Sequence, residues 1–243
     1  LLNEGVVNIS VKALDSGNFT KTFMIGIFAY DEIIVNSEKT YTQGEAIEFE
    51  GKTYYAGYTY LNSLRTACTY ASENATIKVL KGHYDEYIAI NTNGVKIYGV
   101  NHKNGSFEAE DKDDSIFAGT ILIGTDIKDV EIKGMTFIDK ATITLYEHNV
   151  NILIANNKFL NSKSDNADSW KEDEGDACIK LLPSDVECDS VTIINNYFYN
   201  IQVHGIALSA YKNLKITNNV FENFKLDAIR EYYGESLSAG QLL

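Results

Sequence analysis

The sequence is poor in proline and arginine. Its 243 residues include one proline, Pro183, where average usage would place roughly a dozen. Almost every backbone N–H is therefore available for sheet pairing, and a proline-rich stalk is disfavoured. Two of the 21 basic residues are arginine, Arg65 and Arg230, against 34 acidic residues. The formal charge of −13 argues against a nucleic-acid surface, which must neutralise phosphates, and an acidic polymer would need bridging cations.

Cysteine pairs and long apolar runs are also missing. Cys68, Cys178 and Cys188 form no C-x-x-C motif and leave an odd thiol, so we expect buried thiols and neither a disulfide framework nor a zinc site. No run approaches the roughly 18 apolar residues of a membrane span. The first five residues lack an initiator methionine and the features of a signal peptide, and we expect a piece of a longer chain.

What the sequence does contain is a repeat. Four segments share the pattern apolar-x-Ile-x-x-x-x-Phe, ending at Phe137, Phe159, Phe198 and Phe221. Their spacings of 22, 39 and 23 residues indicate a period of about 22 to 23, with an insertion near residues 162–175. Such short strands cannot each bury an apolar face, but coils stacked about 4.8 Å apart bury Ile on Ile and Phe on Phe. The repeat therefore predicts a parallel β-helix.

Three of the four repeats carry an asparagine pair before the aromatic residue. The pairs are Asn156-Asn157, Asn195-Asn196 and Asn218-Asn219. Identical amides stacked at turns can hydrogen-bond from coil to coil. We interpret these pairs as turn builders and not as ligands.

The N-terminal quarter differs from the repeats. Residues 1–30 predict two strands joined by an Asp/Gly/Asn turn, and this segment resembles the last hairpin of a bacterial surface Ig-like domain. Residues 31–57 are predicted to be a connector with a small hairpin. Leu64, Cys68 and Ala71 recur at helical spacing within residues 60–72, which predicts a short helix that caps the β-helix. The β-helix itself is predicted over residues 58–243, truncated at its C-terminus.

From about residue 58 onward, the chain resembles the pectate-lyase-like right-handed parallel β-helix superfamily. The resemblance is carried by S-L at 63–64, A-T-I-K-V at 75–79, G-H-Y-D-E-Y-I at 82–88 and the following Asn-Asn-x-Phe coils. It covers about three quarters of the chain and implies an all-β right-handed parallel β-helix. It implies no single chemistry, because this scaffold carries lyases, hydrolases, tailspikes and non-catalytic adhesins.

A closer similarity to polygalacturonases concerns three short motifs. G-D-A-C-I at 175–179, V-H-G-I at 203–206 and A-I-R-E at 228–231 follow the order of that family's strand motifs. By this resemblance, Asp176 would be the general acid, and His204 and Arg230 would line the substrate site. Inverting hydrolysis also needs a second carboxylate, and the matching positions carry Ala177 and Ala141. A hydrolase is therefore the less favoured hypothesis.

A lyase would use the outward residues of the same strands. If Ile179 points inward, Lys180 points outward, and Arg230 occupies the same column two coils later, roughly 10 Å away. The insertion is rich in carboxylates, whose hard oxygens suit Ca²⁺. The candidate ligands are Asp165, Asp168, Glu172, Asp173 and Asp176. Resemblance to cation-assisted polysaccharide lyases implies that calcium neutralises a uronate while Lys180 or Arg230 takes the C5 proton.

The remaining candidates are contacts to a glycan. Trp170 could stack on a sugar ring, and Asp227 and Tyr232 flank Arg230. We therefore expect an extracellular or cell-surface module directed at an acidic polysaccharide or cell-surface glycan, with calcium-dependent β-elimination as its hypothetical chemistry. The alternatives are a non-catalytic adhesin or stalk and a trimeric tailspike. A second acidic segment, residues 108–114, is predicted to be exposed to solvent.

Overall fold

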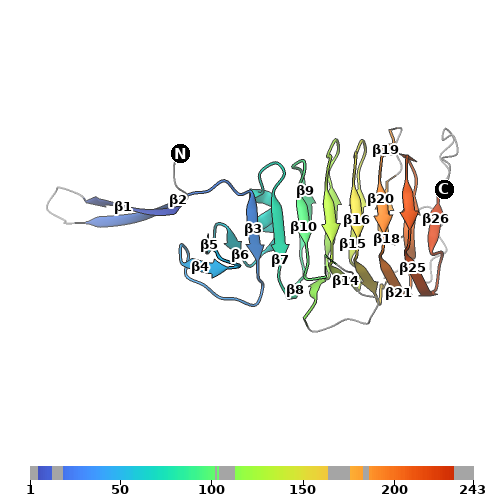
Figure 1. Cartoon of the computed structure of the whole chain (residues 1–243), viewed down its shortest axis with the longest axis horizontal. Helices are drawn as coiled ribbons and strands as arrows, with labels where there is room; N and C mark the ends of the chain where they lie inside the picture. The colour runs from blue at the N-terminus through green and yellow to red at the C-terminus, as the bar shows by residue number, and fades with distance from the viewer. Residues whose placement is uncertain are drawn as a thin grey trace.

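The computed structural model describes residues 5–12, 19–101, 103, 113–163, 176–182 and 186–232. These residues form a parallel β-helix whose coils stack along the long axis of the molecule, preceded by an antiparallel hairpin (Figure 1). The predicted all-β fold class is confirmed. None of the helical structure in the described ranges is long and apolar enough to cross a membrane.

Three parallel sheets make up the walls of the β-helix. The first sheet has the order β24 (Lys215–Thr217), β20 (Thr192–Ile194), β16 (Leu153–Ala155), β13 (Glu131–Lys133), β10 (Lys96–Tyr98), β7 (Thr76–Val79), β3 (Glu32–Val35), β6 (Tyr60–Leu61). The second has the order β25 (Val220–Phe224), β21 (Tyr197–Ile201), β17 (Lys158–Leu160), β14 (Thr136–Ile138), β11 (Ser115–Phe117), β8 (Gly82–Tyr84). The third has the order β26 (Ile229–Glu231), β22 (His204–Leu208), β18 (Ala177–Leu181), β15 (Thr142–Leu145), β12 (Thr120–Ile123), β9 (Tyr87–Ile90).

The core consists of identical side chains stacked from coil to coil. The rings of Phe137, Phe159 and Phe198 lie parallel, with centroids 4.8 and 4.7 Å apart, and Phe221 continues the column at 4.8 Å. On the first sheet, Ile97 pairs in register with Ile77 and Ile132. The predicted stacking of Phe on Phe and Ile on Ile is therefore confirmed.

The asparagine pairs build the turns, as predicted. The first member of each pair adopts a left-handed backbone, with φ of 58° at Asn156 and 56° at Asn195, a conformation that asparagine tolerates better than most residues. The second members form a ladder, in which the Nδ2 of Asn157 donates to the Oδ1 of Asn196 at 3.1 Å and that of Asn196 donates to Asn219 at 3.0 Å. Asn157 and Asn196 are almost fully buried.

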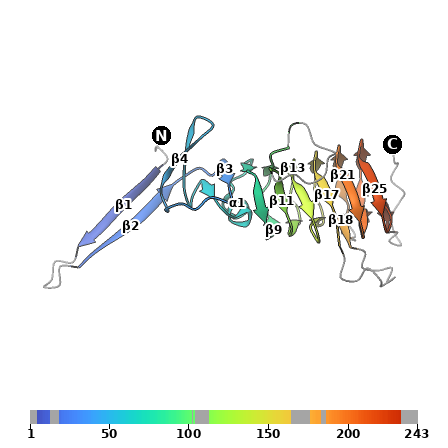
Figure 2. The same ribbon diagram turned by 90° about the horizontal axis from the view of Figure 1, so that it is seen from below.

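A short helix covers the N-terminal end of the β-helix, as expected. Helix α1 (Leu64–Tyr70) starts after Ser63, whose side chain accepts a hydrogen bond from the Thr66 N–H. Its buried residues are Leu64, Ala67 and Cys68. Figure 2 shows α1 next to β3 and β9, where it covers apolar residues of the first coil.

The three cysteines are free and buried, in agreement with the sequence prediction. Burial raises the pKa of the Cys178 thiol to about 12 and that of Cys188 to about 11. Burial also raises the pKa of the Cys68 thiol. All three are therefore protonated near neutral pH, which makes them poor nucleophiles and poor metal ligands.

The N-terminal segments add three further features. Strands β1 (Gly5–Lys12) and β2 (Thr20–Ile27) form the expected antiparallel hairpin, and β4 (Ala46–Phe49) pairs with β5 (Lys52–Tyr55) as the small hairpin of the connector. The segment 31–57 also contains β3, which pairs in parallel with β7 and buries Ile33, Ile34 and Val35. The first sheet therefore includes a strand from before residue 58.

One further strand pair lies near the other end of the β-helix. Strands β19 (Cys188–Asp189) and β23 (Tyr211–Lys212) pair in parallel and extend the turns of two coils.

One buried ion pair corrects the expectation that residues 108–114 are all exposed. The carboxylate of Asp114 lies 2.7 Å from the Nζ of Lys158, and the two side chains are only 4% and 2% exposed. Asp114 also accepts hydrogen bonds from the Thr136 hydroxyl at 2.8 Å and the Asn101 amide at 2.7 Å. Thr136 and Lys158 come from later coils, so the sequence near Asp114 gives no sign of these two partners.

Candidate functional site

The predicted site residues on the β-helix come together on the outer face of its third sheet. Lys180 lies on β18 and pairs in register with Ala207 of β22, which in turn pairs with Arg230 of β26. The two cations therefore occupy one outward column two strand spacings apart, about 10 Å, as the alternation of the strands predicts. His204 begins β22 and pairs with Ala177.

Each cation of this column has an aspartate beside it. The Nζ of Lys180 lies 3.5 Å from the carboxylate of Asp176, and Nη1 of Arg230 lies 3.5 Å from that of Asp227. Both aspartate side chains are at least half exposed, so these are weak surface ion pairs worth no more than about 1 kcal/mol each. A carboxylate of a ligand could replace either aspartate at little cost.

Arg230 is also held by an aromatic ring. Its guanidinium carbon lies 5.6 Å from the centroid of Tyr232, within the range of a cation–π contact. Its Nε is buried and has no hydrogen-bond partner among the residues that the structure describes. An unsatisfied buried donor is costly, whereas the Arg230 side chain as a whole is 43% exposed, and its accessible part is the part that a ligand could reach.

His204 is oriented by Asp227 and Tyr232. Its side chain is only 11% exposed, and its ring stands edge-on to Tyr232 at a centroid distance of 6.4 Å. Burial lowers the pKa of His204, the Arg230 and Lys180 cations lower it further, and Asp227 opposes the shift. Nδ1 lies 3.3 Å from the backbone N–H of Asp227, which donates to it. We therefore assign a neutral ring with its proton on Nε2.

This tautomer restricts the chemistry of the cluster. The Nδ1 lone pair is already used by the Asp227 N–H, so the ring presents only the Nε2–H donor to a ligand. Lys180 and Arg230 act as cations in their ion pairs and hold no lone pair for a proton. In the hydrolase hypothesis, the two positions that lack a catalytic base, Ala141 and Ala177, are buried alanines. The three basic side chains of the cluster are therefore better placed to bind an acidic group than to abstract a proton.

The predicted calcium site falls mostly outside the described residues. Asp165, Asp168, Glu172 and Asp173 lie there, as does Trp170, whereas Asp176 is described and contacts Lys180. Within the described ranges, no group of three or more His, Cys, Asp or Glu side chains is placed to hold a metal ion. The calcium site and the role of Trp170 stay predictions.

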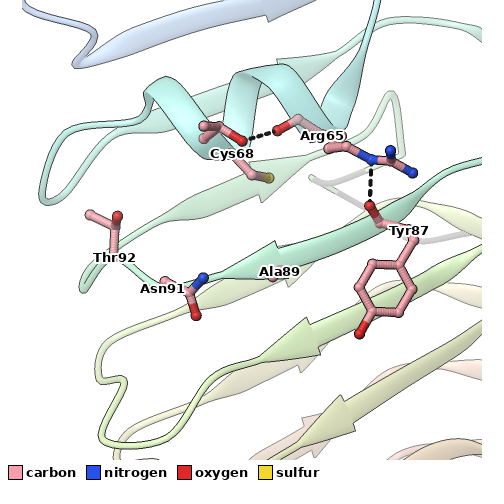
Figure 3. Close-up of a pocket in the computed structure, with 7 residues that line it drawn as sticks. Arg65, Cys68, Tyr87, Ala89, Asn91 and Thr92 are labelled. Carbon is pink, nitrogen blue, oxygen red and sulfur yellow. Dashed lines mark hydrogen bonds between the residues drawn. The ribbon is translucent and has the colours of Figure 1, made fainter.

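Two cavities that the sequence does not predict lie apart from the cluster of His204, Arg230 and Tyr232. The first, about 440 Å³, lies between α1 and β9 and includes Arg65 and Tyr87 (Figure 3). The second, also about 440 Å³, lies at the turns around β19 and β23 and includes His148, whose Nδ1 is 2.8 Å from Asp126. The sequence offers one signal for the first cavity: Arg65, which lines it, is one of the two arginines of the chain. It offers none for the second cavity.

Comparisons of the chain with protein-family models, with curated proteins and with solved structures find no match. The structure shows the architecture, a parallel β-helix, and no family is identified.

Proposed function

We propose that this chain is a carbohydrate-binding β-helix module that holds an acidic glycan on the outer face of its third sheet and does not cleave it. The observation that carries the proposal is the cluster of His204, Arg230 and Tyr232 on and beside the neighbouring strands β22 and β26. On this proposal the glycan is an acidic polysaccharide or cell-surface glycan, and the module works at an extracellular or cell surface.

The composition of the cluster supports a sugar acid as the ligand. The guanidinium of Arg230 is a planar fork suited to a carboxylate, and its side chain is 43% exposed. The ring of Tyr232 can pack against the apolar face of a sugar, and the Nε2–H of His204 can donate to a hydroxyl. The small side chain of Ala207 leaves space between Lys180 and Arg230.

The same contacts support binding over catalysis. A β-elimination needs a base at the C5 proton, and the three basic residues here are either cations in ion pairs or, for His204, already hydrogen-bonded at the Nδ1 lone pair. A lyase would therefore require groups from beyond these residues, such as calcium held by the acidic insertion. A non-catalytic module needs nothing further.

A glycan array tests the proposal. The wild-type chain is applied with calcium and then with EDTA, beside Arg230→Ala and the control Lys215→Ala, which removes an exposed lysine from the first sheet. We expect acidic glycans to bind, and Arg230→Ala to weaken that binding by about tenfold or more while Lys215→Ala does not. Absence of binding to any glycan, or equal binding by Arg230→Ala, would refute it. Ultraviolet absorbance from an unsaturated uronate product would instead establish a lyase.

A further inference from the structure

We propose that the cavity between α1 and β9 is a second glycan subsite, in which Arg65 binds the carboxylate of a sugar acid. The cavity of about 440 Å³ is bordered by the exposed side of α1 and the outward residues of β9 (Figure 3). The choice of a sugar acid as ligand rests on the proposed function, whereas the anion site itself does not involve Lys180, His204 or Arg230.

Arg65 presents a fixed guanidinium. Its Nε donates to the backbone carbonyl of Tyr87 at 2.7 Å, which holds the side chain across the end of β9 (Figure 3). Its terminal nitrogens make no hydrogen bond or ion pair to any residue in the described ranges. Because the fork is already ordered, little side-chain entropy is lost when a carboxylate binds to it in a bidentate manner.

The charge around Arg65 favours an anion. Among the described residues that line the cavity, Arg65 alone is charged. The neighbouring carboxylate, that of Glu86, is occupied at the start of α1, where it accepts from the Ser63 hydroxyl at 2.6 Å and from the N–H groups of Leu64 and Arg65 at 2.9 and 3.0 Å. Arg65 therefore differs from Arg230, whose guanidinium lies beside Asp227.

The other lining groups suit a sugar ring. Tyr87 and Ala89 point outward from β9, Asn91 follows the strand with the same alternation, and Tyr87 is 54% exposed. Ala89 gives a low apolar floor between them, and the amide of Asn91 lies at the far end of the cavity from Tyr87 (Figure 3). An aromatic ring, a fixed cation and an amide are the mixture of apolar and polar groups that orients a small ligand.

The cavity and the Arg230 cluster belong to one face. The outward column that begins at Ala89 continues through Leu122, Thr144, Lys180 and Ala207 to Arg230. Five strand spacings of about 4.8 Å separate its ends by roughly 24 Å. Ala89 lines the same cavity as Arg65, and Arg230 ends the column, so a linear acidic glycan that follows the column could contact both arginines.

The test follows the Nε–H signals of the two arginines, and the backbone N–H signals of Ala89 and Asn91 in the cavity, by NMR while glucuronic acid is added, with glucose as the neutral control. The backbone signals report the affinity at the cavity in the variants that change Arg65 or Tyr87. We expect glucuronic acid to shift the Arg65 signal and glucose to leave it unchanged. Arg65→Lys keeps the charge but loses the fork, and we expect the affinity at this cavity to fall about tenfold. Tyr87→Ala, on the exposed face, provides a second variant should the first fold poorly.

The outcomes separate this inference from the proposed function. A shift at Arg65 that persists in Arg230→Lys supports the subsite even when the Arg230 signal does not respond. A response at Arg230 with none at Arg65 would overturn the subsite and leave the proposed function standing. Unchanged affinity at the cavity in both Arg65→Lys and Tyr87→Ala would also overturn the subsite.

Discussion

The buried pair of Asp114 and Lys158 gives the sharpest test of how the coils are held together. Asp114 precedes β11 and Lys158 begins β17, so their 2.7 Å contact crosses β14, which contributes the hydroxyl of Thr136. Asp114→Ala would leave the buried Lys158 ammonium without this carboxylate and remove the acceptor of Thr136. Breaking a buried pair from one side costs about 3–5 kcal/mol, a large share of the stability of an ordinary domain.

A double variant that replaces both Asp114 and Lys158 should lose little stability. Asp114→Leu combined with Lys158→Met removes both charges and keeps apolar volume, so no buried charge is left without its partner. We expect the loss of stability in the double variant to be much smaller than the summed losses in the single variants Asp114→Leu and Lys158→Met. The reason is that replacement of a whole buried ion pair by apolar residues is often neutral.

Urea unfolding followed by far-UV circular dichroism measures these differences. The matched control is Lys163→Met, which breaks the exposed pair with Asp139 at 2.6 Å and should change the midpoint little. A loss from Asp114→Ala no larger than that from Lys163→Met would refute the argument. So would additive losses in the double variant, because they would mean that the two charges do not depend on one another.

Two further predictions concern the turns and the candidate site. Asn196→Ala removes a buried amide that bridges Asn157 and Asn219 and should lower the free energy of unfolding by about 3 kcal/mol or more. Asn195→Gly keeps the left-handed φ of 56° and should change it by no more than about 1 kcal/mol. Equal urea midpoints for the two variants would contradict this prediction. Because burial lowers the pKa of His204, the unfolded chain binds a proton at higher pH than the folded chain. The free energy of unfolding should therefore fall as the pH drops below about 6.5, and this fall should be smaller in His204→Gln. If the exposed control His83→Gln reduces the fall by the same amount, His204 is not its cause.

The fold was predictable because the inward residues repeat. Phe159 and Phe198 occupy equivalent positions in successive coils, and each side chain packs on its own copy, so the packing problem recurs in the sequence with its period. Asn156 and Asn195 repeat for the same reason, because each coil needs a left-handed residue at the same corner. The strand β3 escaped prediction because it precedes the repeats and shares no motif with them.

The candidate site was only partly predictable because outward residues do not repeat. Alternation alone places Lys180 and Arg230 in one column, and the structure agrees. Alternation gives no information on the hydrogen-bond partners that decide what the site residues can do. One such partner is the Asp227 N–H, which donates to Nδ1 of His204. The Arg65 cavity depends on a helix packing beside a strand more than 20 residues later, which no local pattern encodes.

The distribution of charge links these findings to the choice of ligand. With a net charge of −13, the chain as a whole repels an acidic polymer, and screening limits that repulsion to about 8 Å at physiological salt. A polymer that binds must therefore gain its affinity from short-range contacts at a few fixed cations. Arg65 and Arg230 meet this requirement because one is anchored by the Tyr87 carbonyl and the other by the ring of Tyr232. The outward column from Ala89, in the Arg65 cavity, to Arg230 is roughly 24 Å long, which favours a chain that reaches both sites over a single sugar, since linking two weak contacts raises the effective concentration at the second.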